Sequence, residues 1–196
     1  MLLDRLMPEF DATRIEHRVI DGPPADVYEA AVHADFLDAV RRSMIVRGLF
    51  ALRATAERVA ATARRSPVVS PPEPPFLRLA EMPEHGDWVR LGADPPNEFA
   101  FGVIGRFWAG ETAWAQIDSS AFTSFDSPGY AKIAANLSVR SYGDRRTLLS
   151  YEARTQTTDE TARLAFRRYW KLVSPGIGAV MRSTLALIAD ESRAAR

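Results

Sequence analysis

The sequence contains no cysteine. This absence excludes disulfide bonds, thiolate catalysis and cysteine-ligated zinc. Acidic and basic side chains balance at 25 each, so no overall field draws the protein towards nucleic acid, and no nucleic-acid partner is expected. No apolar run approaches the ~18 residues that a membrane-spanning helix needs, so no transmembrane segment is predicted.

Signals for export and for common catalytic centres are also missing. Residues 1–6 lack the apolar core of a secretory signal peptide, which predicts a cytoplasmic protein. There is no Gly-x-Ser-x-Gly, His-Glu-x-x-His, Gly-x-Gly-x-x-Gly or phosphate-binding loop, so we predict no nucleophile, metal or cofactor. The loop 81–87 carries Glu81, Glu84, His85 and Asp87, but its proline and glycine leave these ligand types without a regular scaffold.

What the sequence has is the composition of one globular domain. It has 196 residues, of which 46% are hydrophobic and 26% charged, enough for one domain with a real core. We therefore assign residues 1–196 to a single domain. The segment 66–75 contains five prolines and cannot be regular structure, so we interpret it as a surface loop.

The charges are unevenly distributed along the chain. Residues 1–40 carry nine acidic and three basic side chains, whereas residues 41–65 carry seven arginines and one glutamate. The simplest interpretation is that the two segments pack near each other and neutralise. The alternative is that the basic segment 41–65 docks on an anionic surface.

Alternating hydrophobicity predicts an antiparallel sheet. Residues 13–20 alternate as a strand, which places Ile15, His17 and Val19 on one face, predicted to point inwards. Two shorter helices should follow, over 25–33 and from about 36 onwards. Further strands are expected near 76–80, 88–91, 98–108, 112–118, 131–141 and 147–156. Their short connections require antiparallel pairing.

The strongest predicted element is a long C-terminal helix. It begins at a capping-box pattern, Thr157-x-x-Glu160, and its apolar residues keep helical spacing as far as Ile188. Only a sheet face of comparable length can cover this stripe. The predicted fold class is therefore α+β, with a curved antiparallel sheet of about six or seven strands wrapped on the helix. Pro175 predicts a kink within it.

The order of these elements resembles the helix-grip fold of the START-like superfamily, also called SRPBCC. This superfamily includes birch-pollen-allergen-like proteins, lipid-transfer domains and polyketide cyclases. The segments similar to an uncharacterised bacterial branch are Glu98–Trp108, Tyr151–Arg154 before Thr158 and Asp159, and Phe166–Trp170 leading to Pro175. The resemblance implies a cavity between sheet and terminal helix for an apolar or amphipathic small molecule.

The candidate ligand-binding residues are mostly apolar or aromatic side chains on the predicted inward parities of the strands and the terminal helix. They are Phe99, Phe101, Arg106, Trp114, Leu137, Tyr151, Phe166, Trp170, Ile177 and Met181. A strongly curved sheet touches a helix along only part of its length, which favours a gap lined by such side chains. Each of them also fits an ordinary core position.

Five polar residues on the predicted strands are interpreted one by one. An inward His17 is either a hydrogen-bonded core histidine or a general base. Arg106 is either an outward charge or a partner for Glu152 or an acidic ligand group. Glu152 and Arg154 share a strand face and should form cross-strand charge pairs, whereas Asn136 is predicted to be exposed.

Three functions remain open on the sequence. The first is binding or carrying a hydrophobic or amphipathic small molecule, lipid-like or polyketide-like. The second is a cyclase or aromatase that uses the same cavity with His17 as its acid–base group. The third is an interaction module that docks an anionic surface through residues 41–65. A homodimer is compatible with each of them.

Overall fold

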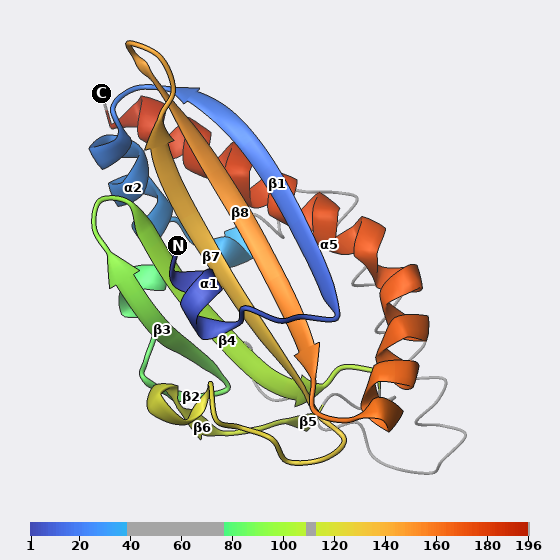
Figure 1. Cartoon of the computed structure of the whole chain (residues 1–196). Helices are drawn as coiled ribbons and strands as arrows, with labels where there is room; N and C mark the ends of the chain where they lie inside the picture. The colour runs from blue at the N-terminus through green and yellow to red at the C-terminus, as the bar shows by residue number, and fades with distance from the viewer. Residues whose placement is uncertain (39–76, 109–112, 196) are drawn as a thin grey trace.

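The structure is a computed structural model that describes residues 1–38, 77–108 and 113–195. Most of the second predicted helix, the basic segment 41–65 and the proline-rich segment 66–75 lie outside these residues. The described part has the predicted α+β architecture of an antiparallel sheet and a long C-terminal helix (Figure 1). The predicted strand over 76–80 is wrong, because Leu79–Glu81 forms a short 3-10 helix.

The main sheet has six strands and is antiparallel throughout. Its order is β1 (Ala12–Asp21), β8 (Arg146–Thr157), β7 (Ala131–Ser141), β4 (Glu98–Arg106) and β3 (Trp88–Asp94), and β5 (Ala113–Trp114) also pairs with β4. The short strands β2 (His85–Gly86) and β6 (Ile117–Asp118) form a separate pair. A tight turn with Gly143 at φ +70° joins β7 to β8, as predicted.

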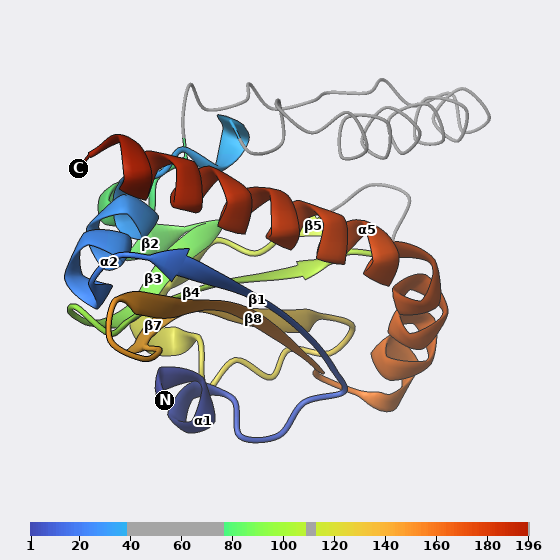
Figure 2. The same ribbon diagram turned by 90° about the horizontal axis from the view of Figure 1, so that it is seen from above.

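The helices lie on opposite faces of this sheet. Helix α5 (Glu160–Ala194) crosses one face beside α2 (Pro24–His33), and the short α1 (Leu2–Leu6) covers the other (Figure 2). We call the face that carries α5 the inner face and the face that carries α1 the outer face. The sheet wraps on its terminal helix, which is the helix-grip arrangement.

Helix α5 is continuous through Pro175 and bends along its length, as Figures 1 and 2 show. A proline inside a helix removes one backbone donor, which accounts for a bend without a break. By length and composition alone, α5 is long and apolar enough to cross a membrane. It packs on β1, β8 and α2, and a core helix of a folded domain has the same composition.

The start of α5 differs from the predicted capping box. Asp159 is the N-cap residue, and its carboxylate accepts hydrogen bonds from the backbone N–H groups of Ala162 and Gly129. These bonds to the charged form lower the pKa of Asp159. The side chain that caps the helix is therefore that of Asp159, two residues after the predicted N-cap residue Thr157.

The lowered pKa of Asp159 makes the stability of the helix start depend on pH. Because the folded-state pKa lies below the unfolded value of about 3.8, the stabilisation is present above that value and is lost as the pH falls through the folded-state pKa. We expect Asp159→Ala to lower the thermal midpoint at pH 7. The difference from the wild type should shrink below about pH 4. Thermal scans at pH 7 and pH 3 measure it, and an equal difference at both would contradict this origin.

The alternation of the three central strands is confirmed by their register. Phe99 pairs with Leu137, and Leu137 pairs with Tyr151, so these three side chains form one row across the inner face. Phe101, Ala135 and Ala153 form the next row. The inner face is apolar here because α5 and α2 pack against it.

The predicted orientation of β1 is wrong. Its register pairs Ile15 with Glu152 and His17 with Ser150, which places both side chains on the outer face. Ile15, His17 and Val19 are all exposed, and His17 bonds the Ser150 hydroxyl through Nδ1 at 2.8 Å. The inner face of this edge strand instead carries long polar side chains, whose aliphatic stems can cover apolar surface next to α5.

Candidate functional site

Packing between α5 and the inner face is tightest towards the C-terminal end of the helix. There Leu185 and Ile188 of α5 meet α2 and the sheet and are at most 1% exposed, as is Leu149 of β8. Each such side chain contributes about 1.5–3 kcal/mol on burial. This end of the interface is buried hydrophobic core.

The middle of the interface is different. Ile133, Tyr151 and Ala153 point from central strands to the inner face, yet all three are only half-buried. Trp170 and Ile177 of α5, on the predicted inward stripe, are also half-buried. We call these five residues the half-buried surface. Apolar groups between a sheet and a helix are normally fully buried, whereas these five side chains keep part of their surface exposed.

A series of neighbouring aromatic rings runs from this surface to the N-terminal part of α5. The ring of Tyr151 lies 6.2 Å from Phe101, which lies 6.0 Å from Trp88. The series continues through Trp114, Phe107, Trp108, Phe166 and Trp170, at centroid separations of 5.4–6.5 Å. Phe36 adds a further ring, 6.2 Å from Phe101. Such a surface is suited to planar or extended apolar molecules.

Tyr151 supplies a polar group on this surface. Burial raises the pKa of its hydroxyl above the ordinary value of 10, so the group is neutral at any physiological pH. None of the hydrogen bonds found among the described residues involves this hydroxyl. Tyr151 can therefore donate to, or accept from, a ligand bound beside it.

A second polar group of residues borders the same surface on the β1 side. Arg14 donates from Nε and Nη2 to Oε1 of Glu16, at 2.9 and 2.5 Å. Arg182 of α5 donates from Nη1 to the same oxygen at 2.8 Å. We call these three residues the polar corner. Sequence reasoning missed them, because the inward parity of β1 was assigned to its apolar residues.

The structure brings most of the predicted ligand-binding residues to the inner side of the sheet. Phe99, Phe101, Leu137, Phe166 and Met181 are buried there or on the facing helix. Trp114 reaches the aromatic series from an edge strand but remains 39% exposed. The role of these residues in binding stays a prediction.

Arg106 does not belong to this group. Its parity is that of Glu98 and Ile104, on the outer face, and its guanidinium lies 4.4 Å from the centroid of the Tyr130 ring. The predicted partnership with Glu152 is wrong, because Glu152 accepts a hydrogen bond from Arg154 instead. The outward interpretation of Arg106 is correct.

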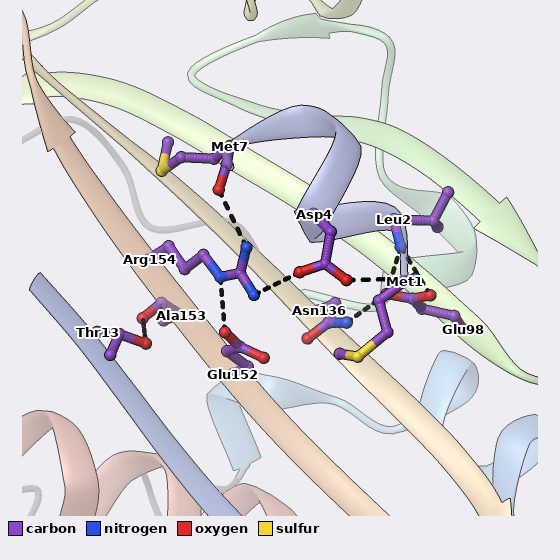
Figure 3. Close-up of polar contacts among 10 residues, drawn as sticks. All are labelled: Met1, Leu2, Asp4, Met7, Thr13, Glu98, Asn136, Glu152, Ala153 and Arg154. Atoms are coloured by element: carbon purple, nitrogen blue, oxygen red, sulfur yellow. Dashed lines mark hydrogen bonds and ion pairs between the residues drawn. The ribbon is translucent and has the colours of Figure 1, made fainter. Parts of the chain in front are cut away.

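The outer face carries a buried polar network under α1 (Figure 3). Arg154 donates to Glu152 at 2.6 Å, to the carbonyl of Met7 at 3.0 Å and to Asp4 at 2.8 Å. Glu152 and Arg154 pair along one strand rather than across strands. The network attaches the N-terminal segment to the sheet. Its hydrogen bonds use Nε, Nη1 and Nη2 of Arg154 as donors.

The second part of this network corrects the prediction for Asn136. Asn136 is fully buried and donates to the carboxylate of Glu98, which also accepts the backbone N–H of Leu2 at 2.9 and 3.0 Å. Helix α1 lies over this part of β7. A five-residue helix shows too little periodicity to be predicted from sequence.

The acidic loop at 81–87 has other contacts. His85 pairs with Asp118 at 2.9 Å between Nδ1 and Oδ1, and Glu84 pairs with Arg90. Asp87 accepts from Gln116. In the described part of the chain, no three His, Asp or Glu side chains are grouped so that they could hold a metal ion.

No protein-family model matches the chain, and no curated protein matches it in sequence. Solved structures with a similar fold include a conserved protein from Geobacillus kaustophilus, 10% identical over 91% of this chain and 96% of that one, with a TM-score of 0.38. A protein from Thermus thermophilus is 10% identical over 94% of this chain and 99% of that one, with a TM-score of 0.36. The Zhui aromatase/cyclase from a Streptomyces species is 12% identical over 94% of this chain and 96% of that one, with a TM-score of 0.31.

The fold assignment rests on the strand order, the register and the position of α5 described above. At these identities and TM-scores, the likenesses carry no argument about ligand or reaction.

Proposed function

We propose that the protein binds or carries a hydrophobic or amphipathic small molecule between the inner face and α5. The half-buried surface is the observation that carries this proposal. Apolar side chains that stay partly exposed between a sheet and a helix forgo burial free energy of about 25 cal/mol per Å². A ligand that covers them recovers this free energy, and the aromatic series extends the surface available to it.

The enzymatic alternative is less well supported by the inner face. A cyclase or aromatase was predicted to use His17 as its acid–base group, but His17 lies exposed on the outer face. General acid–base catalysis requires a titrating group within hydrogen-bond reach of the substrate. The neutral Tyr151 hydroxyl orients a ligand more readily than it exchanges protons with one. Docking through the basic segment 41–65 concerns residues outside those described.

A matched pair of substitutions tests whether the middle of the interface has space. Ala153 and Ala135 are cross-strand partners on the inner face, but Ala153 is half-buried and Ala135 is 2% exposed. We expect Ala135→Phe to lower the free energy of unfolding by about 1–3 kcal/mol, since extra volume in a packed core forces shifts. Ala153→Phe should change it by no more than about 0.5 kcal/mol.

The same pair tests ligand binding. Native mass spectrometry of freshly purified wild-type protein should show a bound apolar small molecule, and Ala153→Phe should remove it because the ring fills the site. Urea unfolding of both variants measures the stability changes. If Ala153→Phe is as destabilising as Ala135→Phe, the middle of the interface is solid core and the proposed function is wrong.

A further inference from the structure

We propose that the bound molecule is an amphipathic carboxylate and that the polar corner binds its acidic head. This inference rests on the proposed function and adds the chemical class of the ligand. Arg14 pairs with Ala153 across the β1–β8 register, and Glu16 pairs with Tyr151. The polar corner is therefore the direct neighbour of the half-buried surface on the same face of the sheet.

The polar corner has an unbalanced positive charge. Two guanidinium groups converge on one oxygen of Glu16. Among the ion pairs of the described residues, no other carboxylate contacts Arg14 or Arg182. Guanidinium has five N–H donors, and these bonds use two of Arg14 and one of Arg182. The remaining donors and the excess charge suit a second carboxylate, which arginine binds through parallel hydrogen bonds.

The Arg14 guanidinium lies against α5 at Gly178. A Cβ at position 178 would lie 2.4 Å from Nη2 and 2.7 Å from Cζ of Arg14, closer than real contacts allow. Glycine is a poor residue for a helix interior. The close approach that it permits brings a charged group to the boundary between β1 and α5, beside Ile177 of the half-buried surface.

The degree of exposure also suits a charged head. Arg14 is 32% exposed and Arg182 is 54% exposed, whereas Glu16 is 15% exposed. A carboxylate bound here keeps part of its hydration, which limits the desolvation cost of binding it. The aromatic series leads away from this corner along the inner face and accommodates the apolar body. The site thus has one polar and one apolar end.

Two fluorescent probes with the same acyl chain and the same fluorophore test this inference. They are 11-(dansylamino)undecanoic acid and its methyl ester, whose head is uncharged and one methyl group larger. We expect the wild type to bind the acid about tenfold more tightly than the ester. Arg14→Met should remove this preference by weakening the acid while leaving the ester unchanged. Gly178→Ala should do the same, because its Cβ displaces the guanidinium.

Arg193→Met is the matched control, since Arg193 is an exposed arginine of α5 that pairs with Asp190. It should retain the full preference for the acid. If the wild type binds acid and ester equally, the inference is wrong and the proposed function stands. If neither probe binds, both are wrong. If Arg14→Met and Gly178→Ala keep the tenfold preference, the polar corner does not bind the head.

Discussion

Replacing Arg154 by methionine should lower the free energy of unfolding by about 3–5 kcal/mol. Arg154 and its partner Glu152 are both nine-tenths or more buried, and the substitution leaves the Glu152 carboxylate without its cation. It also removes the bonds that attach the N-terminal segment through Met7 and Asp4. Equilibrium unfolding in urea measures this loss.

A double variant separates the charge effect from a general packing defect. Glu152→Leu combined with Arg154→Met replaces the buried ion pair by apolar side chains, and it should recover most of the lost stability. Arg193→Ala removes an exposed ion pair and should cost less than about 1 kcal/mol. If the double variant is as unstable as the single one, the uncompensated charge is not the cause.

Phe166→Ala should cost about 3–5 kcal/mol as well. Phe166 is 2% exposed and its ring contacts Trp108, Tyr169 and Trp170. It is the main buried anchor of the N-terminal part of α5, before the proline at 175. Its removal leaves a cavity that the surrounding rings cannot fill, and the urea midpoint should fall without a change in slope.

Leu172→Ala is the control on the same helix. Leu172 is 81% exposed, so its truncation should change the free energy of unfolding by less than about 0.5 kcal/mol. Comparable losses from the two substitutions would contradict the role of Phe166 as a buried anchor, because alanine is the better helix former at both positions. A smaller slope for Phe166→Ala would indicate that the N-terminal part of the helix unfolds separately.

The elements that sequence predicted best have one face covered by a large partner. Strands β4, β7 and β8 alternate because α5 and α2 cover their inner face, and the helical stripe of α5 is the counterpart of that face. The row of Phe99, Leu137 and Tyr151 follows directly from this alternation. Alternation with a period of two residues predicts which side chains face the core whenever one side of a strand is uniformly apolar.

Two parts of the candidate site and its surroundings departed from that rule. On β1 the inner face is polar at Arg14 and Glu16, so the apolar parity pointed the wrong way. On the outer face Asn136 and Glu152 look like exposed positions, and only the presence of α1 above them makes them buried. In both cases the deciding contact comes from a segment distant in sequence.

The pairing of β1 with β8 has a consequence for how the chain reaches its native state. Ala12 is matched with Thr155 and Asp21 with Arg146, so the first strand of the sheet finds its neighbour only after most of the polypeptide has been made. Contacts between such remote segments slow folding. During synthesis on the ribosome, the N-terminal strand therefore remains unpaired until the final third of the chain emerges.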